Sequence, residues 1–300
     1  GPRTLLVTAT TVLSCMLSEF FSRKIMKRQG TLGDLSAIVT GILLAFNLPA
    51  TIPLWVAAIG SVVAIVVVKQ FFGGIGQNFV NPALVGRIVL MASFPTIMST
   101  WVQPFAWRGV QVVTTASPLA SISSMFTAGD VSAAATASNP ALPSLWQMLI
   151  GQRQGSLGEV CALALLLGFA YLLIRRVITP VIPLTYIGTV AVIMLIAGKG
   201  SLSFVAYEIL GGGLLLGAIF MATDYTTSPI NFKGKLIYGV GCGILTALIR
   251  LFGSLPEGVS FSIIIMNILV PHIERITTPK PFGSAKTPKK KQSRKKEAGA

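Results

Sequence analysis

The chain has 300 residues, of which 53% are hydrophobic and only 11% are charged. Ordinary water-soluble domains carry about 25% charged residues, so the composition excludes that class. The formal net charge is +15, but eight basic residues and one acidic residue lie between Lys280 and Ala300. Because nearly half of the excess lies in these 21 residues, it does not indicate a nucleic-acid-binding protein. We interpret the chain as an all-α polytopic membrane protein with a basic tail.

Nine apolar segments have about the length that a membrane-spanning helix needs, which is roughly 20 residues. Several are short or interrupted by Gly and Pro, which membrane helices tolerate when neighbouring groups satisfy the freed backbone. The predicted spans are 4–22, 34–50, 53–69, 83–98, 157–174, 179–197, 204–221, 236–252 and 258–274.

The distribution of Lys and Arg orients these spans, because basic residues accumulate in cytoplasmic loops. With the cluster Arg23, Lys24, Lys27 and Arg28 placed inside, 19 basic residues fall on the cytoplasmic side and 5 outside. The segment 99–156 is then an external loop and the tail 277–300 is cytoplasmic. The N-terminus is placed outside, so we expect one further helix to precede this chain, which gives ten in total.

A weak internal repeat relates the two halves. Residues 36–53 align with 212–229, which places Gly41 over Gly217, and the sequence that begins at Lys69 resembles the one that begins at Arg250. The topology places the two copies in opposite orientation, as an inverted repeat of five helices requires. Chance similarity between helices rich in Leu and Gly is the alternative.

Two polar interruptions of the apolar pattern are candidate binding segments. The first is GGIGQNFVNPALVGR (73–87), in which Asn78 and Asn81 can both donate and accept hydrogen bonds. The second is ATDYTTSP (222–229), in which Asp224 is an acidic residue at the end of a span. Acidic residues at membrane depth are functional candidates. The alternative is that Asn81 and Asp224 only cap helices.

Two further acidic residues, Glu19 and Glu208, lie within predicted spans. They either line a cation path or pair with cations across helices, and the sequence leaves both alternatives open. The three cysteines, Cys15, Cys161 and Cys242, are scattered through apolar runs and the only histidine is His272. This pattern predicts no metal site and no disulfide framework.

Five motifs in order along the chain resemble the D subunit of the Rnf electron-transport complex. They are GDLSAIVTGILLAFNLP, KQFFGGIGQNFVNPALVGR, TTASPLA, GAIFMATDYTTSP and LPEGVSFSIIIMNILVPHI. The chain is more distantly similar to the B subunit of the Na⁺-translocating NADH:quinone oxidoreductase. The resemblance implies a ten-helix bundle of two inverted five-helix repeats. We therefore divide the chain into a first membrane repeat (1–98, lacking its first helix), the external loop (99–156), a second membrane repeat (157–276) and the tail (277–300).

The resemblance also implies two flavins. The family attaches FMN covalently through a phosphoester at the last residue of the pattern D-x-x-[ST]-x-A-[ST], which Thr114, Ala116 and Ser117 match, although Gln111 stands in place of the Asp. Ser117 is thus the expected attachment residue, and Thr114 and Thr115 are alternative acceptors. Without the resemblance, the small and hydroxyl-bearing residues of TTASPLA would indicate only a linker. The family also binds riboflavin non-covalently, and we assign Asn78, Asn81 and Asp224 as its candidate contacts.

The implied function is that of a flavin-carrying membrane subunit of an ion-pumping ferredoxin:NAD⁺ oxidoreductase, which relays electrons and is coupled to Na⁺ or H⁺ translocation. The chain lacks cluster cysteines and a dinucleotide fingerprint, so we expect an enzyme subunit that is not catalytically complete alone. Its expected partners are Rnf subunits A, B, C, E and G, a flavin transferase and lipid of a prokaryotic cytoplasmic membrane. The alternatives are the quinone-reductase B subunit, a urea-transporter-like solute channel and a scaffold anchored by its tail.

Overall fold

The computed structural model describes residues 1–102, 114, 115, 119, 121–123, 142–253 and 258–279. Within these residues the protein is almost entirely helical, and a helix occupies each of the nine predicted apolar segments. Two short strands, β1 (Trp101–Val102) and β2 (Thr114–Thr115), pair antiparallel within the segment that the sequence marks as an external loop.

The first half of the fold, residues 1–98, is built from helices packed around α1 and α2. Pro2 begins α1 and Pro82 begins α4, where the missing N–H of proline would have no partner within the helix. The helix α3 continues directly into a π-helical stretch, η2. The elements are α1 (Pro2–Ile25), η1 (Leu32–Asp34), α2 (Ser36–Phe46), α3 (Leu54–Val62), η2 (Val63–Gln70), α4 (Pro82–Ser93) and α5 (Pro95–Met98).

The second half, residues 157–276, contains one strongly bent span. The helix α11 ends before Gly211, and the chain resumes as α12 and the π-helical stretch η4 at an angle of 64° to α11. The elements, with α8 from the preceding segment, are α8 (Leu145–Ile150), α9 (Ala162–Ile174), α10 (Val181–Ala197), α11 (Leu202–Leu210), α12 (Leu214–Leu216), η4 (Gly217–Met221), α13 (Phe232–Phe252) and α14 (Val259–Thr277).

The lengths and surfaces of the helices are those of a membrane protein. Three of the described helices, α1, α13 and α14, are long and apolar enough to cross a bilayer, and the bent pair of α11 with α12 and η4 makes a fourth. The other apolar helices are 10–17 residues long. Leu5 and Leu13 on α1 are 74% and 58% exposed. Such an apolar outer surface is costly in water and is expected where lipid covers it.

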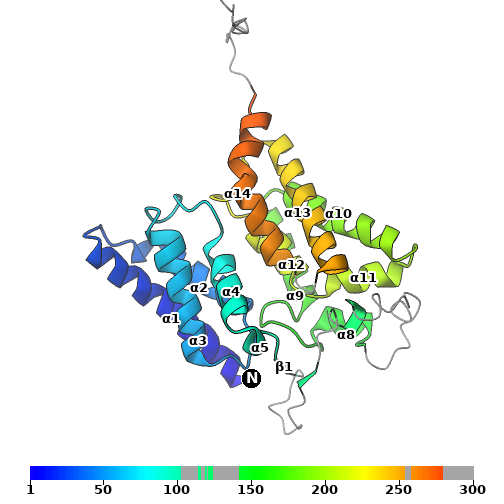
Figure 1. Ribbon diagram of the computed structural model, residues 1–300, viewed down its shortest axis with the longest axis horizontal. Coiled ribbons are helices and arrows are strands. Elements are labelled where there is room, and N and C mark those ends of the chain that lie inside the picture. Colours follow the sequence, from blue (N-terminus) through cyan, green and yellow to red (C-terminus); the bar gives the residue numbers. More distant parts are fainter. Residues whose placement is uncertain (103–113, 116–118, 120, 124–141, 254–257, 280–300) are drawn as a thin grey trace, which may run out of the picture.

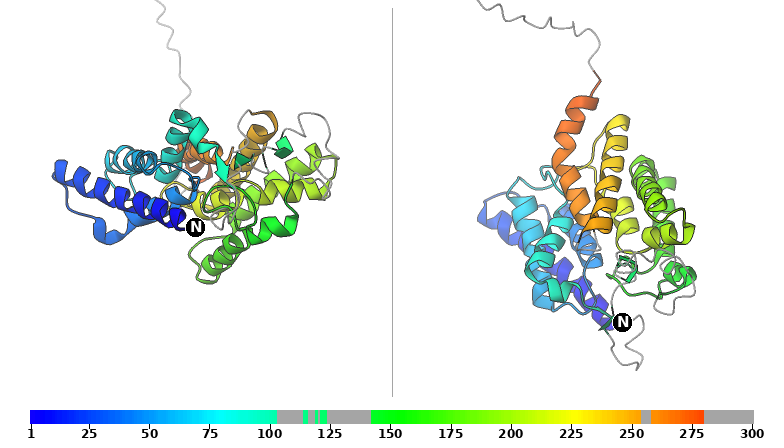
Figure 2. Two further views of the ribbon diagram at one scale, coloured as in Figure 1. Left: turned by 90° about the horizontal axis from the view of Figure 1, so that it is seen from below. Right: turned by 45° about the vertical axis from the view of Figure 1, so that its right-hand side comes forward.

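The two halves lie side by side, as Figures 1 and 2 show, and one buried apolar cluster runs through both of them. Leu44 and Leu84 contribute from the first half, and Tyr186, Ala218 and Ile263 from the second. The strand β1 lies at the same end of the molecule as the N-terminus, whereas α14 ends at the opposite end (Figure 1).

The start of α9 differs from the prediction. The apolar pattern places this span at 157–174, but α9 begins at Ala162. The preceding residues instead bond to the end of α2, because the N–H groups of Leu157 and Gly158 donate to the carbonyls of Leu48 and Phe46 at 3.0 and 2.8 Å. The bond to Phe46 satisfies a carbonyl that the end of α2 leaves without a helical partner, and Leu48 lies just after that end.

Candidate functional site

A cavity of about 600 Å³ lies between the two halves and contains all three residues assigned to the second flavin. Asn78 and Asn81 line it from the loop before α4, and Asp224 lines it from the loop after η4. Its other polar lining comes from Asp34, Ser36, Thr40, Lys69, Thr223 and Thr226, and its apolar lining includes Val39, Leu43, Leu172, Ile178, Ile219 and Phe220. The cavity therefore combines a large apolar wall with clustered polar groups, as small-molecule sites commonly do.

Asn81 has two roles in this cavity. Its Oδ1 accepts hydrogen bonds from the backbone N–H groups of Ala83 and Leu84 at 3.1 and 3.4 Å, so it caps α4. Its Nδ2 donates to the carbonyl of Met221 at 3.3 Å, across to the other half. The capping alternative is therefore confirmed for Asn81, and the same side chain also joins the first polar interruption to the end of η4.

Asn78 and Asp224 are connected through Thr226. The buried Asn78 donates from Nδ2 to Thr226 Oγ1 at 3.2 Å, and Thr226 Oγ1 donates to Asp224 Oδ2 at 2.9 Å. Asp224 also accepts a hydrogen bond from Thr227 Oγ1 at 3.1 Å. Asp224 lies in the loop between η4 and α13, where its Oδ1 accepts from the backbone N–H of Thr226 at 3.5 Å, so it caps a turn of that loop and not a helix.

The attachment motif is described only in part. Thr114 pairs with Val102 and Thr115 with Trp101 in the β1–β2 ladder. Gln111, Ala116 and Ser117 lie outside the described residues. Leu119, two residues after Ser117, is buried, and one of its methyl groups would lie 2.9 Å from a Cβ added to Gly212. This contact places Leu119 against the bend between α11 and α12.

Glu19 forms a buried ion pair with Lys69. Lys69 Nζ lies 3.0 Å from Glu19 Oε2, and the two side chains are 4% and 1% exposed. Gln70 Nε2 and Thr31 Oγ1 donate to Glu19 Oε1 at 2.9 and 2.6 Å, and Lys69 also donates to Ser36 Oγ at 2.5 Å. Glu19 was expected either to line a cation path or to pair across helices, and the structure shows that it pairs across helices.

Glu208 forms the corresponding pair in the second half. Arg250 Nη1 lies 3.0 Å from Glu208 Oε2, and both side chains are buried. Arg250 also donates to the carbonyls of Glu208 and Gly211 at 2.5 and 3.3 Å. It therefore satisfies backbone groups that the break between α11 and α12 exposes, as an interrupted membrane helix requires.

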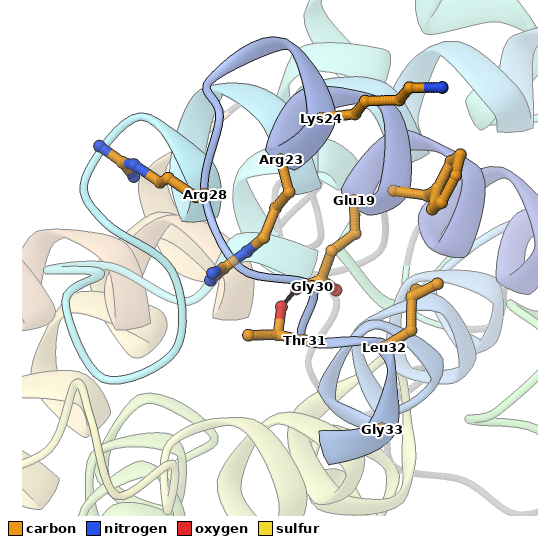
Figure 3. A pocket seen from close by; sticks show the side chains of 9 residues that line it. Glu19, Arg23, Lys24, Arg28, Gly30, Thr31, Leu32 and Gly33 are labelled. Atoms are coloured by element: carbon orange, nitrogen blue, oxygen red, sulfur yellow. Dashed lines mark hydrogen bonds between the residues drawn. The ribbon is translucent and has the colours of Figure 1, made fainter.

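A second pocket, of about 460 Å³, lies at the end of α1 and is lined by Glu19, Arg23, Lys24, Arg28 and the segment Gly30–Gly33 with Phe20. Figure 3 shows Lys24 and Arg28 pointing in different directions. Arg23 and Arg28 donate to the carbonyls of Gln29 and Gln70. Glu19 lines this pocket whereas Lys69 lines the larger cavity, so the ion pair stands between the two.

Sequence reasoning missed Lys69, Ser36 and Thr226 as members of the larger cavity. Lys69 comes from η2 and Ser36 from the start of α2, so only the fold brings them to the polar interruptions. Asp34 Oδ1 accepts hydrogen bonds from the N–H and Oγ of Ser36, the first residue of α2, at 2.9 and 2.5 Å. Among the described residues, no three His, Cys, Asp or Glu side chains form a metal-binding group.

Comparison with known proteins identifies the family. The model of the NQR2, RnfD, RnfE family matches residues 1–283. The D subunit of the Na⁺-translocating ferredoxin:NAD⁺ oxidoreductase complex of Acetobacterium woodii is 44% identical over 286 residues, which is 95% of this chain and 84% of that protein.

Two further relatives have related descriptions. The D subunit of the proton-translocating ferredoxin:NAD⁺ oxidoreductase complex of Clostridium ljungdahlii is 39% identical over 95% of this chain and 85% of its own length. The D subunit of an ion-translocating oxidoreductase complex of Stutzerimonas stutzeri is 38% identical over 83% of this chain and 76% of its own length. These matches confirm the resemblance drawn from the five motifs, and the chain belongs to the NQR2, RnfD, RnfE family.

Proposed function

We propose that this protein is the D subunit of an Rnf-type, ion-translocating ferredoxin:NAD⁺ oxidoreductase complex. The observation that carries the proposal is the similarity over nearly the whole chain to proteins that are subunits of such complexes. It acts with the other subunits, A, B, C, E and G, in a prokaryotic cytoplasmic membrane. Electrons pass through its flavins, and this passage is coupled to movement of Na⁺ or H⁺.

The proposed architecture is nine spans in this chain, belonging to a ten-helix bundle of two inverted repeats. Two observations support it. A helix occupies each predicted span, and the aligned residues Lys69 and Arg250 each form a buried ion pair with a glutamate from an earlier helix of the same half. Cysteine accessibility across sealed vesicles tests the orientation, with the tail labelled from the cytoplasmic side and residues 99–156 from the outside.

The covalent flavin of the proposal is FMN, attached to Ser117 by a flavin transferase. The support is the match to the attachment pattern at Thr114, Ala116 and Ser117, together with the position of β1 and β2 at the end of the molecule opposite to the end of α14 (Figure 1). If the tail is cytoplasmic, this motif is external. The test is flavin fluorescence of the denatured band, which Ser117→Ala should abolish.

The non-covalent flavin of the proposal is riboflavin, bound in the cavity between the halves. The cavity volume of about 600 Å³ lies within the range of 300–1,000 Å³ that is usual for small-molecule pockets. Apolar side chains such as Leu43, Ile219 and Phe220 suit the faces of the ring, and Asn78, Asn81 and Asp224 suit its polar edge or the ribityl hydroxyls. The flavin supplies the redox chemistry, and the protein positions it and sets its electrostatic surroundings.

Acid extraction of the purified complex tests this second site. We expect riboflavin in the supernatant of the wild type and at least a tenfold weaker retention when both Asn78 and Asp224 are replaced by Ala. Ser99→Ala/Thr100→Ala is a matched control for the loss of two polar side chains, because neither residue lines the cavity. Wild-type complex without extractable riboflavin would refute the site.

A further inference from the structure

The ion pair of Lys69 and Glu19 is oriented with respect to the cavity between the halves. Lys69 lines that cavity, whereas Glu19 lines the separate pocket at the end of α1. The pair is therefore a fixed dipole whose positive end faces the cavity.

This dipole is held firmly in place. Glu19 Oε1 accepts hydrogen bonds from Thr31 and Gln70, and Lys69 Nζ donates to Ser36 Oγ as well as to both oxygens of Glu19. The side chains of the two charged residues are almost fully buried. A buried charge acts over a longer range than an exposed one, because water does not screen it.

We infer that Lys69, held by Glu19, is a positioning residue that stabilises the reduced, negatively charged form of the flavin relative to its oxidised form. The inference rests on the proposed riboflavin site. An isoalloxazine ring that accepts two electrons and one proton carries one negative charge, and the electrons come from a neighbouring carrier in the complex. A fixed cation in the cavity wall favours that charge, and its loss lowers the midpoint potential.

Two carboxylates in the same cavity act in the opposite direction. Asp34 is exposed, so solvent screens its charge, and Asp224 accepts hydrogen bonds from Thr226 and Thr227. The side chain of Lys69 is only 4% exposed. The buried cation is thus screened the least of the charged groups that line the cavity.

The ion pair of the second half is a matched control. Arg250 and Glu208 are also 3.0 Å apart and buried, but neither lines this cavity. Neutralising that pair removes the same kind of interaction without removing a charge from the cavity wall.

The experiment uses the full chain in lipid nanodiscs, carrying Ser117→Ala so that covalent flavin does not contribute to the signal. Riboflavin is the probe, and its midpoint potential is measured by redox titration of its absorbance. The double variant Glu19→Gln/Lys69→Gln is compared with Glu208→Gln/Arg250→Gln. Both variants remove a whole ion pair, so neither leaves an unpaired buried charge.

We expect Glu19→Gln/Lys69→Gln to weaken binding of reduced relative to oxidised riboflavin about tenfold, which lowers a two-electron potential by about 30 mV. Glu208→Gln/Arg250→Gln should change this ratio less than twofold. An unchanged or raised potential in the first variant, or equal shifts in both, overturns the inference. A parent chain that binds no riboflavin refutes the proposed site instead.

A second replacement of the same pair decides the matter if Glu19→Gln/Lys69→Gln does not fold. Glu19→Gln/Lys69→Met removes the same charge from the cavity wall with an apolar side chain of similar length, a kind of change that buried sites often tolerate. It should weaken binding of reduced relative to oxidised riboflavin about tenfold, and an unchanged or raised ratio overturns the inference.

Discussion

Lys69 and Arg250 make equivalent contacts in the two halves of the fold, since each places a side-chain nitrogen 3.0 Å from a buried glutamate oxygen. The partners, Glu19 and Glu208, come from α1 and α11. A buried ion pair contributes little net stability compared with apolar residues of similar size, but removing one partner leaves an uncompensated charge. The ion pair therefore affects the free energy of unfolding chiefly when one of its two partners is removed.

The first prediction concerns the pair in the second half. Arg250→Gln alone should destabilise the chain by about 3–5 kcal/mol, because Glu208 stays buried without its cation. Glu208→Gln/Arg250→Gln should lower the free energy of unfolding by distinctly less than Arg250→Gln alone. The measurement is the free energy of unfolding of the purified chain in detergent, from denaturant titration. If Arg250→Gln alone is at least as stable as Glu208→Gln/Arg250→Gln, the prediction is wrong.

The second prediction separates the two roles of Asn81. Asn81→Ala removes the cap of α4, worth about 0.5–2 kcal/mol, and also the bond to the Met221 carbonyl, worth about 1 kcal/mol. Asn81→Ser keeps a capping oxygen without adding a charge and loses the amide donor to Met221. Thermal unfolding should therefore rank wild type above Asn81→Ser and Asn81→Ser above Asn81→Ala. Equal losses in the two variants would show that capping contributes nothing.

The third prediction concerns the bend between α11 and α12. Gly212 has a φ of +59°, and an added Cβ would lie 2.9 Å from Leu119 and 3.2 Å from Arg250. Gly212→Ala should cost about 1–2 kcal/mol for the left-handed backbone and about 1–3 kcal/mol more for overpacking. Because Leu119 follows the attachment motif closely, covalent flavin should also decrease.

Gly200→Ala is the matched control for this prediction. Its φ is +86°, and nothing lies within 4 Å of an added Cβ. Gly200→Ala should therefore have only the energetic cost of the left-handed backbone and no cost of overpacking. The comparison uses free energies of unfolding and flavin fluorescence of the denatured band. If Gly200→Ala proves as costly as Gly212→Ala, close packing against Leu119 is not the cause.

The fourth prediction concerns the chemistry of attachment. Ser117→Thr should keep the fluorescent band, because a threonine hydroxyl forms the same phosphoester, whereas Ser117→Ala should lose it. Thr115→Ala should keep at least half of the signal, since Thr115 is only an alternative acceptor. Mass analysis of the flavin-bearing peptide identifies the acceptor. If the wild-type peptide carries FMN at Thr114 or Thr115, then Ser117 is not the attachment residue.

Hydropathy and the spacing of Pro and Gly were sufficient to locate the helices. The start of α9 was missed because Leu157 and Gly158 are as apolar as a span yet bond to the end of α2. The bend at Gly211–Gly213 is a tertiary feature held by Arg250 from another helix, and no local pattern predicts its angle of 64°.

The candidate cavity was predicted only in part. Asn78, Asn81 and Asp224 stood out because polar groups are rare in apolar sequence, and the fold brings them together. Lys69 did not stand out, since a basic residue at the end of a span reads as a loop cation. It is buried, as are Arg87 and Arg250, which lie within the predicted spans 83–98 and 236–252. Which carboxylate each cation meets depends on tertiary packing.

The shared walls of the cavity have a mechanical consequence. Asn81 belongs to one half of the molecule, and the carbonyl it bonds, that of Met221, belongs to the other. A ligand in the cavity contacts both halves, so its binding free energy depends on how the two halves are placed relative to each other. By reciprocity, a ligand whose affinity for two such placements differs between its redox states shifts the preferred placement when it changes state.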